Sequence, residues 1–242
     1  SRLFTNSPGL CARHTGRVPA SRFEFFDQPF AAFAHRGGRV DEADCLRENT
    51  LYAFEQAVRL GYRYLETDVH ATADGHLIAF HDDRLDRVTD RSGRVADLTL
   101  RQIRQARIGG IDQIPTLEEL LEAFPQARLN IDIKAPSAIA PLVRTIRRHQ
   151  AQRRVCVGSF SNTSLRRFRS LMGRDVATAV SPAGVLAATL VPSWLTRRFS
   201  TGVAFQIPTT YRVHGLQLPV LSSRLLETAQ RHGQRVQVWT IN

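Results

Sequence analysis

Strand-like and helix-like segments alternate along this chain from residue 31 onward, and this alternation constrains the fold more than any other feature. The strand-like segments are short and rich in Val, Ile, Phe and Ala, as buried parallel strands should be. Alternating β and α units predict a parallel sheet, and eight strands in 242 residues favour closure into a (β/α)8 TIM barrel of the α/β class. The eight segments are 31–35, 64–70, 77–81, 129–133, 155–160, 176–180, 203–207 and 235–241.

Amphipathic patterns between these segments predict the covering helices. Thr99 and Thr116 are each followed three residues later by Gln or Glu, the spacing of a capping box, and Asn49 or Thr50 can cap the first helix. An open doubly wound sheet is the alternative, but no glycine-rich nucleotide-binding loop supports it. The apolar patterns are Leu51/Phe54/Val58, Leu117/Leu120/Leu121/Phe124 and Ile139/Leu142/Val143/Ile146.

Two stretches depart from a plain barrel. Residues 82–115 are too many for a simple connection, so we expect a small insertion there, after the third strand-like segment. The chain stops at Asn242, directly after the last strand-like segment, so the last helix of the barrel is missing from this sequence. The predicted organisation is an N-terminal extension over 1–30 and a barrel domain over 31–242, with the insertion at 82–115.

Charged residues alternate with apolar ones in two strand-like segments. Glu66 and Asp68 share one face of a strand, and Asp132 and Lys134 share one face of another. Buried carboxylates repel each other and are unfavourable to desolvate, and a divalent cation relieves both effects. Three oxygen ligands suit Mg²⁺ or Ca²⁺. The alternatives are an internal Asp–Lys ion pair and a transition-metal site with histidine ligands.

Two histidines end strand-like segments. His35 ends the first and His81 the third, and the C-terminal ends of barrel strands hold the chemistry of this fold. Imidazole titrates near neutrality, so the pair can serve as general base and general acid. Gly37 and Gly38 allow a sharp turn, which can bring His35 and Arg36 to the same side.

The formal net charge of +11 indicates either an anionic partner or a compositional bias. The 33 basic residues are 32 arginines and one lysine, so the bias toward a solvated arginine surface is the favoured interpretation. The exception is Lys134. A compact ammonium suits a phosphate oxygen or a metal-bound carboxylate better than a planar guanidinium does.

The cysteine pattern argues for a reducing compartment. The chain has three cysteines, far apart in sequence, and this odd number argues against a disulfide framework: Cys11, Cys45 and Cys156. The sequence contains no CxxC motif, so it does not indicate a structural zinc site. No apolar run reaches the roughly 20 residues of a membrane span. We therefore expect a cytoplasmic location.

Five sequence runs together resemble the glycerophosphodiester phosphodiesterase family, in order and spacing, over roughly residues 31–242. They are AHRGG (34–38), RENT (47–50), ETDVHATADGHLIAFHDD (66–83), NIDIK (130–134) and VWTIN (238–242). The resemblance implies a (β/α)8 barrel that hydrolyses glycerophosphodiesters, its small-molecule substrates, to an alcohol and glycerol 3-phosphate.

The resemblance also implies a role for each site residue. The acid–base pair is His35 and His81, and the phosphate contacts are Arg36 and Lys134. One divalent cation, Mg²⁺ or Ca²⁺, is held by Glu66, Asp68 and Asp132. The family usually has Glu where this chain has Asp132. The side chain of Asp132 is one methylene shorter, which can change the coordination geometry and the preference for one metal ion.

Two other functions stay open. A phospholipase D-like enzyme acting on lysophospholipids or sphingomyelin fits the apolar segment 186–195, which can touch lipid, and weak contact with a membrane surface goes with it. A basic, non-catalytic nucleic-acid-binding module fits the charge but not the histidines and carboxylates at strand ends. We expect no nucleic-acid partner, and the sequence indicates no oligomeric state.

Overall fold

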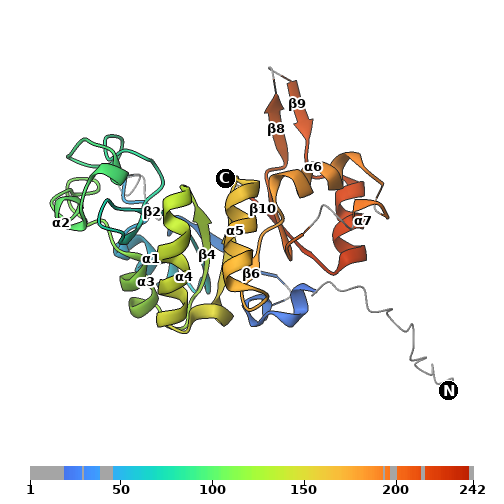
Figure 1. Cartoon of the computed structure of the whole chain (residues 1–242), viewed down its shortest axis with the longest axis horizontal. Coiled ribbons are helices and arrows are strands. Elements are labelled where there is room, and N and C mark those ends of the chain that lie inside the picture. Colours follow the sequence, from blue (N-terminus) through green and yellow to red (C-terminus); the bar gives the residue numbers. More distant parts are fainter. Residues whose placement is uncertain are drawn as a thin grey trace.

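The computed structural model describes residues 19–28, 30–38, 46–192, 194–196, 201–213 and 216–239 (Figure 1). The strands are β1 (Phe33–His35), β2 (Tyr64–Ala71), β3 (Leu77–Ala79), β4 (Arg128–Ile133), β5 (Val155–Gly158), β6 (Ala177–Thr178), β7 (Ala204–Ile207), β8 (Thr210–Val213), β9 (Leu216–Pro219) and β10 (Arg235–Val238). The helices are α1 (Leu51–Arg59), α2 (Leu100–Ile103), α3 (Leu117–Ala123), α4 (Ile139–Arg148), α5 (Asn162–Met172), α6 (Pro182–Leu190) and α7 (Ser223–His232).

The parallel strands form the wall of an α/β barrel. Five of them pair in the order β1-β2-β4-β5-β6. A parallel bridge between Ala179 and Ala204 extends this order to β7, which pairs in parallel with β10. Figure 1 shows α4 and α5 alongside β4 and β6. The parallel strands therefore follow one another as in a (β/α)8 barrel, although within the described residues no pairing joins β10 back to β1.

The third strand-like segment is not one of the parallel strands, which corrects the expectation for 77–81. β3 pairs antiparallel with β2, with Ala71 opposite Leu77. Only a five-residue turn joins the two strands, and in it the amide of Thr72 donates to the carbonyl of His76. A parallel connection needs a dozen or more residues, so this turn permits only a hairpin. A second antiparallel hairpin, β8–β9, was not expected from the sequence.

Separate apolar clusters hold the parts of the chain together. The largest lies between the parallel strands and helices α1, α3, α4 and α5. Segment 82–115 has its own cluster, which includes Leu85, Val88, Val95 and Ile103. Residues 19–28 pack Phe25 and Phe26 against the first residues of several strands, so they cover the N-terminal end of the barrel. The domain boundaries expected above remain a prediction.

The expectations about membrane spans and cysteines can be compared with the structure only over the described residues. None of the helices in the described ranges combines the length and apolar character needed to span a bilayer. Cys156 is buried and free, and burial raises the pKa of its thiol to about 12. Cys11 and Cys45 lie outside the described residues.

Candidate active site

The strand register gathers the predicted site residues at one end of the sheet. His35 ends β1 opposite Glu66 of β2, and Asp68, two residues further along β2, lies opposite Asp132 of β4. Because these strands are parallel, the residues and the loops that follow them share the C-terminal end of the barrel, where the fold places its chemistry.

Lys134 follows β4 and joins two strands. Its ammonium Nζ lies 2.9 Å from Oδ1 of Asp68 and 2.8 Å from Oδ2 of Asp132. Burial alone would lower the pKa of Lys134, but the two carboxylates raise it above its usual value. The internal Asp–Lys ion pair, which the sequence left open, is therefore present, and Asp68 shares it.

Arg36 is turned into the site by the glycines after it. Its backbone has φ of 53° and Gly37 follows at φ of 88°, so the chain reverses directly after β1. A Cβ at Gly37 would lie 2.8 Å from Cβ of Ala53, so only glycine fits there. The Arg36 amide donates to Oε2 of Glu66 (3.0 Å), and its Nε lies 3.3 Å from Oδ2 of Asp68.

The surroundings of Glu66 and His35 shift the pKa values of both groups toward their neutral forms. Burial, and then the charge of Asp68, raises the pKa of Glu66 well above its usual value, and burial also raises the pKa of Asp132. Burial, and then the charge of Arg36, lowers the pKa of His35, whose Nε2 lies 3.8 Å from Oε2 of Glu66. A neutral His35 near neutral pH is suited to accept a proton.

His81 follows β3 and is held from both sides. Its Nδ1 donates to Oδ1 of Asp82 at 2.5 Å, and its backbone carbonyl accepts from Nε2 of His70 at 3.1 Å. Burial acts to raise the pKa of Asp82, but hydrogen bonds from Arg87 and His81 bring it to about 2. Asp82 is thus a carboxylate at neutral pH, and because a carboxylate only accepts hydrogen bonds, it holds an N–H on Nδ1 of His81.

The sequence interpretation missed several residues that support the site. Asn49 is 1% exposed; its Nδ2 donates to Oδ2 of Asp68 at 3.3 Å, and its Oδ1 accepts from Thr67 at 2.8 Å. Glu48 accepts hydrogen bonds from Arg36 and Arg87. The RENT run contained the signal for Glu48 and Asn49, because their place in the resemblance marks them as more than helix caps.

Three acidic residues of the site can supply ligands to a divalent cation. Glu66, Asp68 and Asp132 supply carboxylate oxygens, the donors that Mg²⁺ and Ca²⁺ prefer. Burial is the largest cause of the raised pKa values of Glu66 and Asp132, and the charge of Asp68 adds to it, so a cation bound to these oxygens would stabilise their charged forms. The residues therefore fit such an ion in charge and donor type. As the described side chains stand, however, no group of three or more His, Cys, Asp or Glu is arranged to hold a metal ion.

An aromatic pair stands beside the phosphate-binding candidate Lys134. Phe160 and Trp239 make an edge-to-face contact with ring centroids 6.0 Å apart, and Nζ of Lys134 lies 5.8 Å from the Phe160 centroid. Phe160 is 67% exposed. The site thus has an apolar wall open to solvent.

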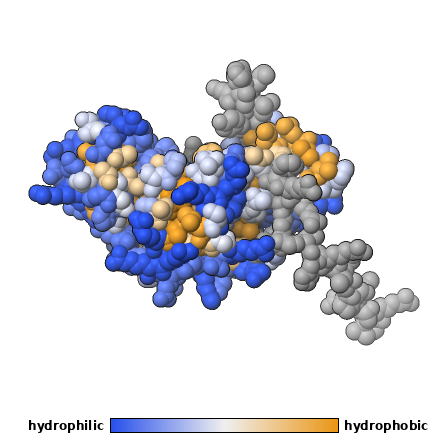
Figure 2. Space-filling view, viewed as in Figure 1, coloured by the Kyte–Doolittle hydropathy of each residue, from blue (hydrophilic) through white to orange (hydrophobic). Residues whose placement is uncertain are grey.

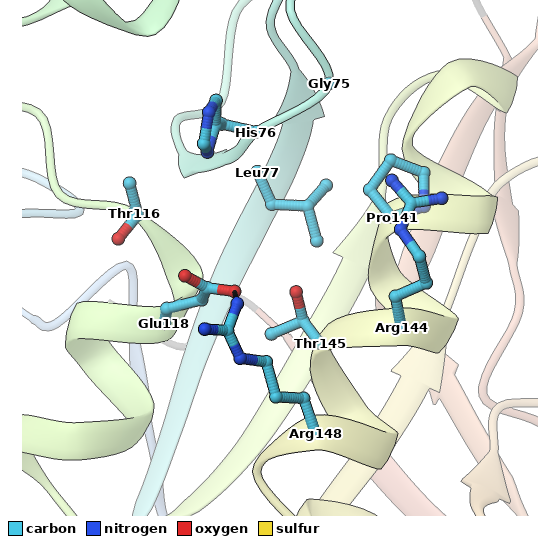
Figure 3. Close-up of a pocket in the computed structure, with 9 residues that line it drawn as sticks. All are labelled: Gly75, His76, Leu77, Thr116, Glu118, Pro141, Arg144, Thr145 and Arg148. Carbon is cyan, nitrogen blue, oxygen red and sulfur yellow. Dashed lines mark ion pairs between the residues drawn. The ribbon is translucent and has the colours of Figure 1, made fainter.

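A cavity of about 330 Å³ lies elsewhere, on the outer side of the fold between β3, α3 and α4 (Figure 3). Its lining includes His76, Thr116, Arg144 and Arg148, and it contains none of the predicted site residues. Because the charged groups converge at the strand ends, that end and not this cavity is the candidate active site.

All seven residues predicted from the sequence thus meet at one end of the barrel. Direct contacts link Arg36, Glu66, Asp68, Asp132 and Lys134, and His35 lies beside Glu66. His81 reaches Arg36 through other side chains. The arrangement offers acid–base groups, cations for an anionic substrate and acidic ligands in one place. Which group performs which role remains a prediction.

Solved structures support the fold. The chain superposes on a phosphodiesterase from Oleispira antarctica, determined in complex with the product sn-glycerol-3-phosphate, with a TM-score of 0.71 and 24% identity over 88% of this chain and 85% of that one. A glycerophosphodiester phosphodiesterase from Agrobacterium tumefaciens matches with a TM-score of 0.69 and 22% identity over 88% and 87%.

Sequence relatives lead to the family itself. A probable glycerophosphodiester phosphodiesterase 2 of Mycobacterium tuberculosis is 37% identical over 227 residues, which span 88% of this chain and 84% of that protein. A human lysophospholipase D is 36% identical over 114 residues, which span 42% of this chain and 35% of that protein. Residues 35–242 match the profile of the glycerophosphoryl diester phosphodiesterase family, and this chain belongs to that family.

Proposed function

We propose that this protein is a metal-dependent phosphodiesterase that hydrolyses glycerophosphodiesters to an alcohol and glycerol 3-phosphate. One observation carries the proposal: two histidines, three carboxylates, one arginine and the sole lysine of the chain converge at the C-terminal ends of parallel strands. The same substrate class is supported by the name of the relative that matches over most of its length and by the product bound in the Oleispira structure.

The chain's own residues divide the work in this proposal. Arg36 and Lys134 bind the phosphate and stabilise the negative charge that grows on it during reaction. His35 and His81 are the acid–base pair: one accepts a proton from the nucleophile and the other gives a proton to the departing alcohol. Held by Glu66, Asp68 and Asp132, Mg²⁺ or Ca²⁺ would supply Lewis-acid stabilisation of the phosphoryl oxygens.

The nucleophile is either water or the neighbouring hydroxyl of the glycerol. The two differ in their products, because attack by the hydroxyl first gives a cyclic glycerol phosphate. Following ³¹P spectra during turnover of glycerophosphocholine separates them: a transient cyclic phosphate marks the intramolecular attack, and direct appearance of glycerol 3-phosphate marks water.

The test of the function is a panel of glycerophosphodiesters with choline, ethanolamine, inositol and glycerol as the alcohol, each assayed with Mg²⁺ and with Ca²⁺. Release of glycerol 3-phosphate from at least one member, lost in EDTA and restored by one of the ions, is expected. No turnover of any member with either ion would contradict the proposal.

A second candidate substrate class is the lysophospholipids, cleaved at the same phosphodiester bond. The exposed aromatic pair of Phe160 and Trp239 favours it, because an apolar wall beside Lys134 can hold part of an acyl chain. Comparing lysophosphatidylcholine with glycerophosphocholine decides between the two: a kcat/KM that is higher for the acylated substrate would assign the protein to this second class.

Weak contact with a membrane surface belongs to the proposal as well. Figure 2 shows apolar surface over the α6 region, and Leu186 and Leu190 on that helix are each at least 60% exposed. An exposed apolar patch of this kind is typical of a surface that meets a lipid or a partner. We propose no nucleic-acid partner.

A further inference from the structure

Arg87 reaches two carboxylates that belong to different parts of the chain. Its Nε donates to Oδ2 of Asp82 at 2.5 Å, and its Nη2 donates to Oε1 of Glu48 at 2.5 Å. Asp82 follows β3, whereas Glu48 precedes α1. The guanidinium therefore links the loop after β3 to the loop before α1 by hydrogen bonds, at the C-terminal end of the barrel.

Each of these carboxylates also holds a predicted site residue. Asp82 accepts the Nδ1 proton of His81, and Glu48 accepts from Nη1 of Arg36 at 3.2 Å. The contacts form one continuous chain, from His81 through Asp82, Arg87 and Glu48 to Arg36. An acid–base candidate and a phosphate-binding candidate are thus tied to each other through Arg87.

Arginine is suited to this position and lysine is not. The planar guanidinium presents several N–H groups in a fixed fork, so it binds two carboxylates at once and fixes the angle between them. The two carboxylates raise the pKa of Arg87, which keeps it charged. Without it, Glu48 and Asp82 would lose the cation that they share.

The backbone that carries Arg87 is firmly anchored. Leu85 and Val88, on either side of it, are 1% and 3% exposed within the apolar cluster of segment 82–115. A second link joins this segment to the loop before α1: Nε of Arg47 lies 2.6 Å from Oδ2 of Asp112. The insertion therefore presents Arg87 from a rigid base.

We propose that Arg87 is a positioning residue, and that segment 82–115 uses it to hold His81 and Arg36 in register over the strand ends. The inference rests on the proposed function, because it gives a purpose to residues of that same site. Asp82 fixes Nδ1 of His81, which leaves Nε2 as the ring nitrogen that exchanges protons with the substrate. Glu48 fixes the guanidinium of Arg36, which leaves its remaining N–H groups for the phosphate.

The two branches of this chain of contacts predict different kinetic defects. Asp82→Asn disturbs His81 and should lower kcat with little change in KM. Glu48→Gln frees Arg36 and should chiefly raise KM. Arg87→Ala affects both, and we expect kcat/KM to fall about 10- to 100-fold, as when the hydrogen-bond partners that orient metal ligands are removed.

Segment 82–115 also supplies a matched control. Arg84 lies three residues earlier and pairs with Asp86 at 3.2 Å on the surface, instead of with Asp82 or Glu48. Arg84→Ala removes the same charge from the same segment and should leave kcat and KM unchanged. Melting temperatures measured beside the kinetics separate positioning from folding, because both arginines are about half exposed and should contribute little to stability.

Chemical rescue sharpens the test. The Arg87 side chain is 46% exposed, so its place is open to solvent, and added guanidinium at millimolar concentration should restore part of the kcat of Arg87→Ala. Arg87→Lys, which keeps the charge but not the fork, should remain impaired. Rescue without a change in melting temperature would support positioning, since a folding defect does not respond in this way.

The outcomes that overturn the inference are distinct from failure of the proposed function. If the wild-type protein cleaves no glycerophosphodiester, the function itself is wrong. If the wild-type protein is active and Arg87→Ala matches it in kcat and KM, the positioning role is wrong. A loss shared equally by Arg84→Ala, or a fall in melting temperature that accounts for the lost activity, would also overturn it.

Discussion

The ammonium of Lys134 lies 2.8 Å from Oδ2 of Asp132, and the pair stands at the end of β4 facing Asp68. One lysine therefore balances two of the three clustered carboxylates. The third, Glu66, has a pKa raised by burial and by the charge of Asp68. A divalent cation among these oxygens should stabilise the fold and not only the reaction.

Adding Mg²⁺ or Ca²⁺ should therefore raise the melting temperature of the metal-free protein by several degrees, as binding to the native state alone does. Asp132→Asn removes one oxygen charge and should abolish the rise, whereas Asp132→Glu should keep it and shift the preference between the two ions. Differential scanning calorimetry at several ion concentrations measures this. Asp86→Asn, at an exposed position, is the control, and an Asp132→Asn protein that responds like wild type would exclude Asp132 as a ligand.

Substituting His35 or His81 should reduce activity far more than substituting a histidine outside the site. His35→Ala or His81→Ala should lower turnover of the best glycerophosphodiester by roughly 100- to 10,000-fold, because each removes one partner of acid–base catalysis. His76→Ala is the matched control, since His76 lines the outer cavity of Figure 3 and is exposed. Near-wild-type rates for both site variants would refute their assignment.

Local signals in the sequence predicted local structure well. Both capping boxes are present, with Thr99 and Thr116 accepting from the backbone three residues later, and Thr50 caps α1. The apolar face of α1 was predicted only in part: Phe54 is buried as expected. Leu51 and Val58 are exposed, and Ala53 and Ala57 are buried beside Phe54 instead.

Long-range contacts were beyond the sequence patterns. The seven site residues could be found because strand periodicity and strand ends bring them together. Arg87 lies in an irregular segment, and nothing in its local pattern indicates that it meets Glu48, 39 residues away in the chain. Likewise, the apolar composition of β3 does not reveal whether the strand runs parallel or antiparallel to β2. The short turn before β3 contains that information, because it permits only an antiparallel hairpin.

Stability should respond to acid through Asp27. The hydrogen bond from Arg128, and then that from the hydroxyl of Tyr64, lowers the pKa of Asp27 to about 2, against the opposing effect of burial. The folded pKa is depressed, so the stabilisation is present above the usual value of 3.8 and is lost as the pH falls toward 2.

Asp27→Asn should therefore lower the free energy of unfolding at pH 7 by about 1–2 kcal/mol, the shift being discounted because the carboxylate is partly exposed. The variant should also lose less stability than wild type between pH 4 and pH 2. Urea unfolding across that range measures both effects. Asp97→Asn, at an exposed position, should behave as wild type, and an equal acid response in all three proteins would contradict the prediction.

We expect the exposed apolar face of α6 to bind anionic lipid. Residues 135–242 contain 15 arginines and two carboxylates, a formal charge of +13, whereas residues 1–134 contain 18 basic and 20 acidic residues, a charge of −2. Within the basic part, α6 carries no charged residue and exposes Leu186 and Leu190. An apolar face on a strongly cationic part of a protein favours an anionic membrane surface.

The protein should therefore sediment with vesicles that contain phosphatidylglycerol, and more weakly with pure phosphatidylcholine or at high salt, because charge and apolar contact act together. Replacing Leu186 and Leu190 by Ser should reduce the affinity about tenfold or more, since each loses apolar surface buried in the interface. Leu60→Ser is the matched control: Leu60 is 66% exposed but follows α1 in the weakly acidic part. Equal sedimentation of the α6 variant and wild type would show that charge alone, and not α6, brings the protein to lipid.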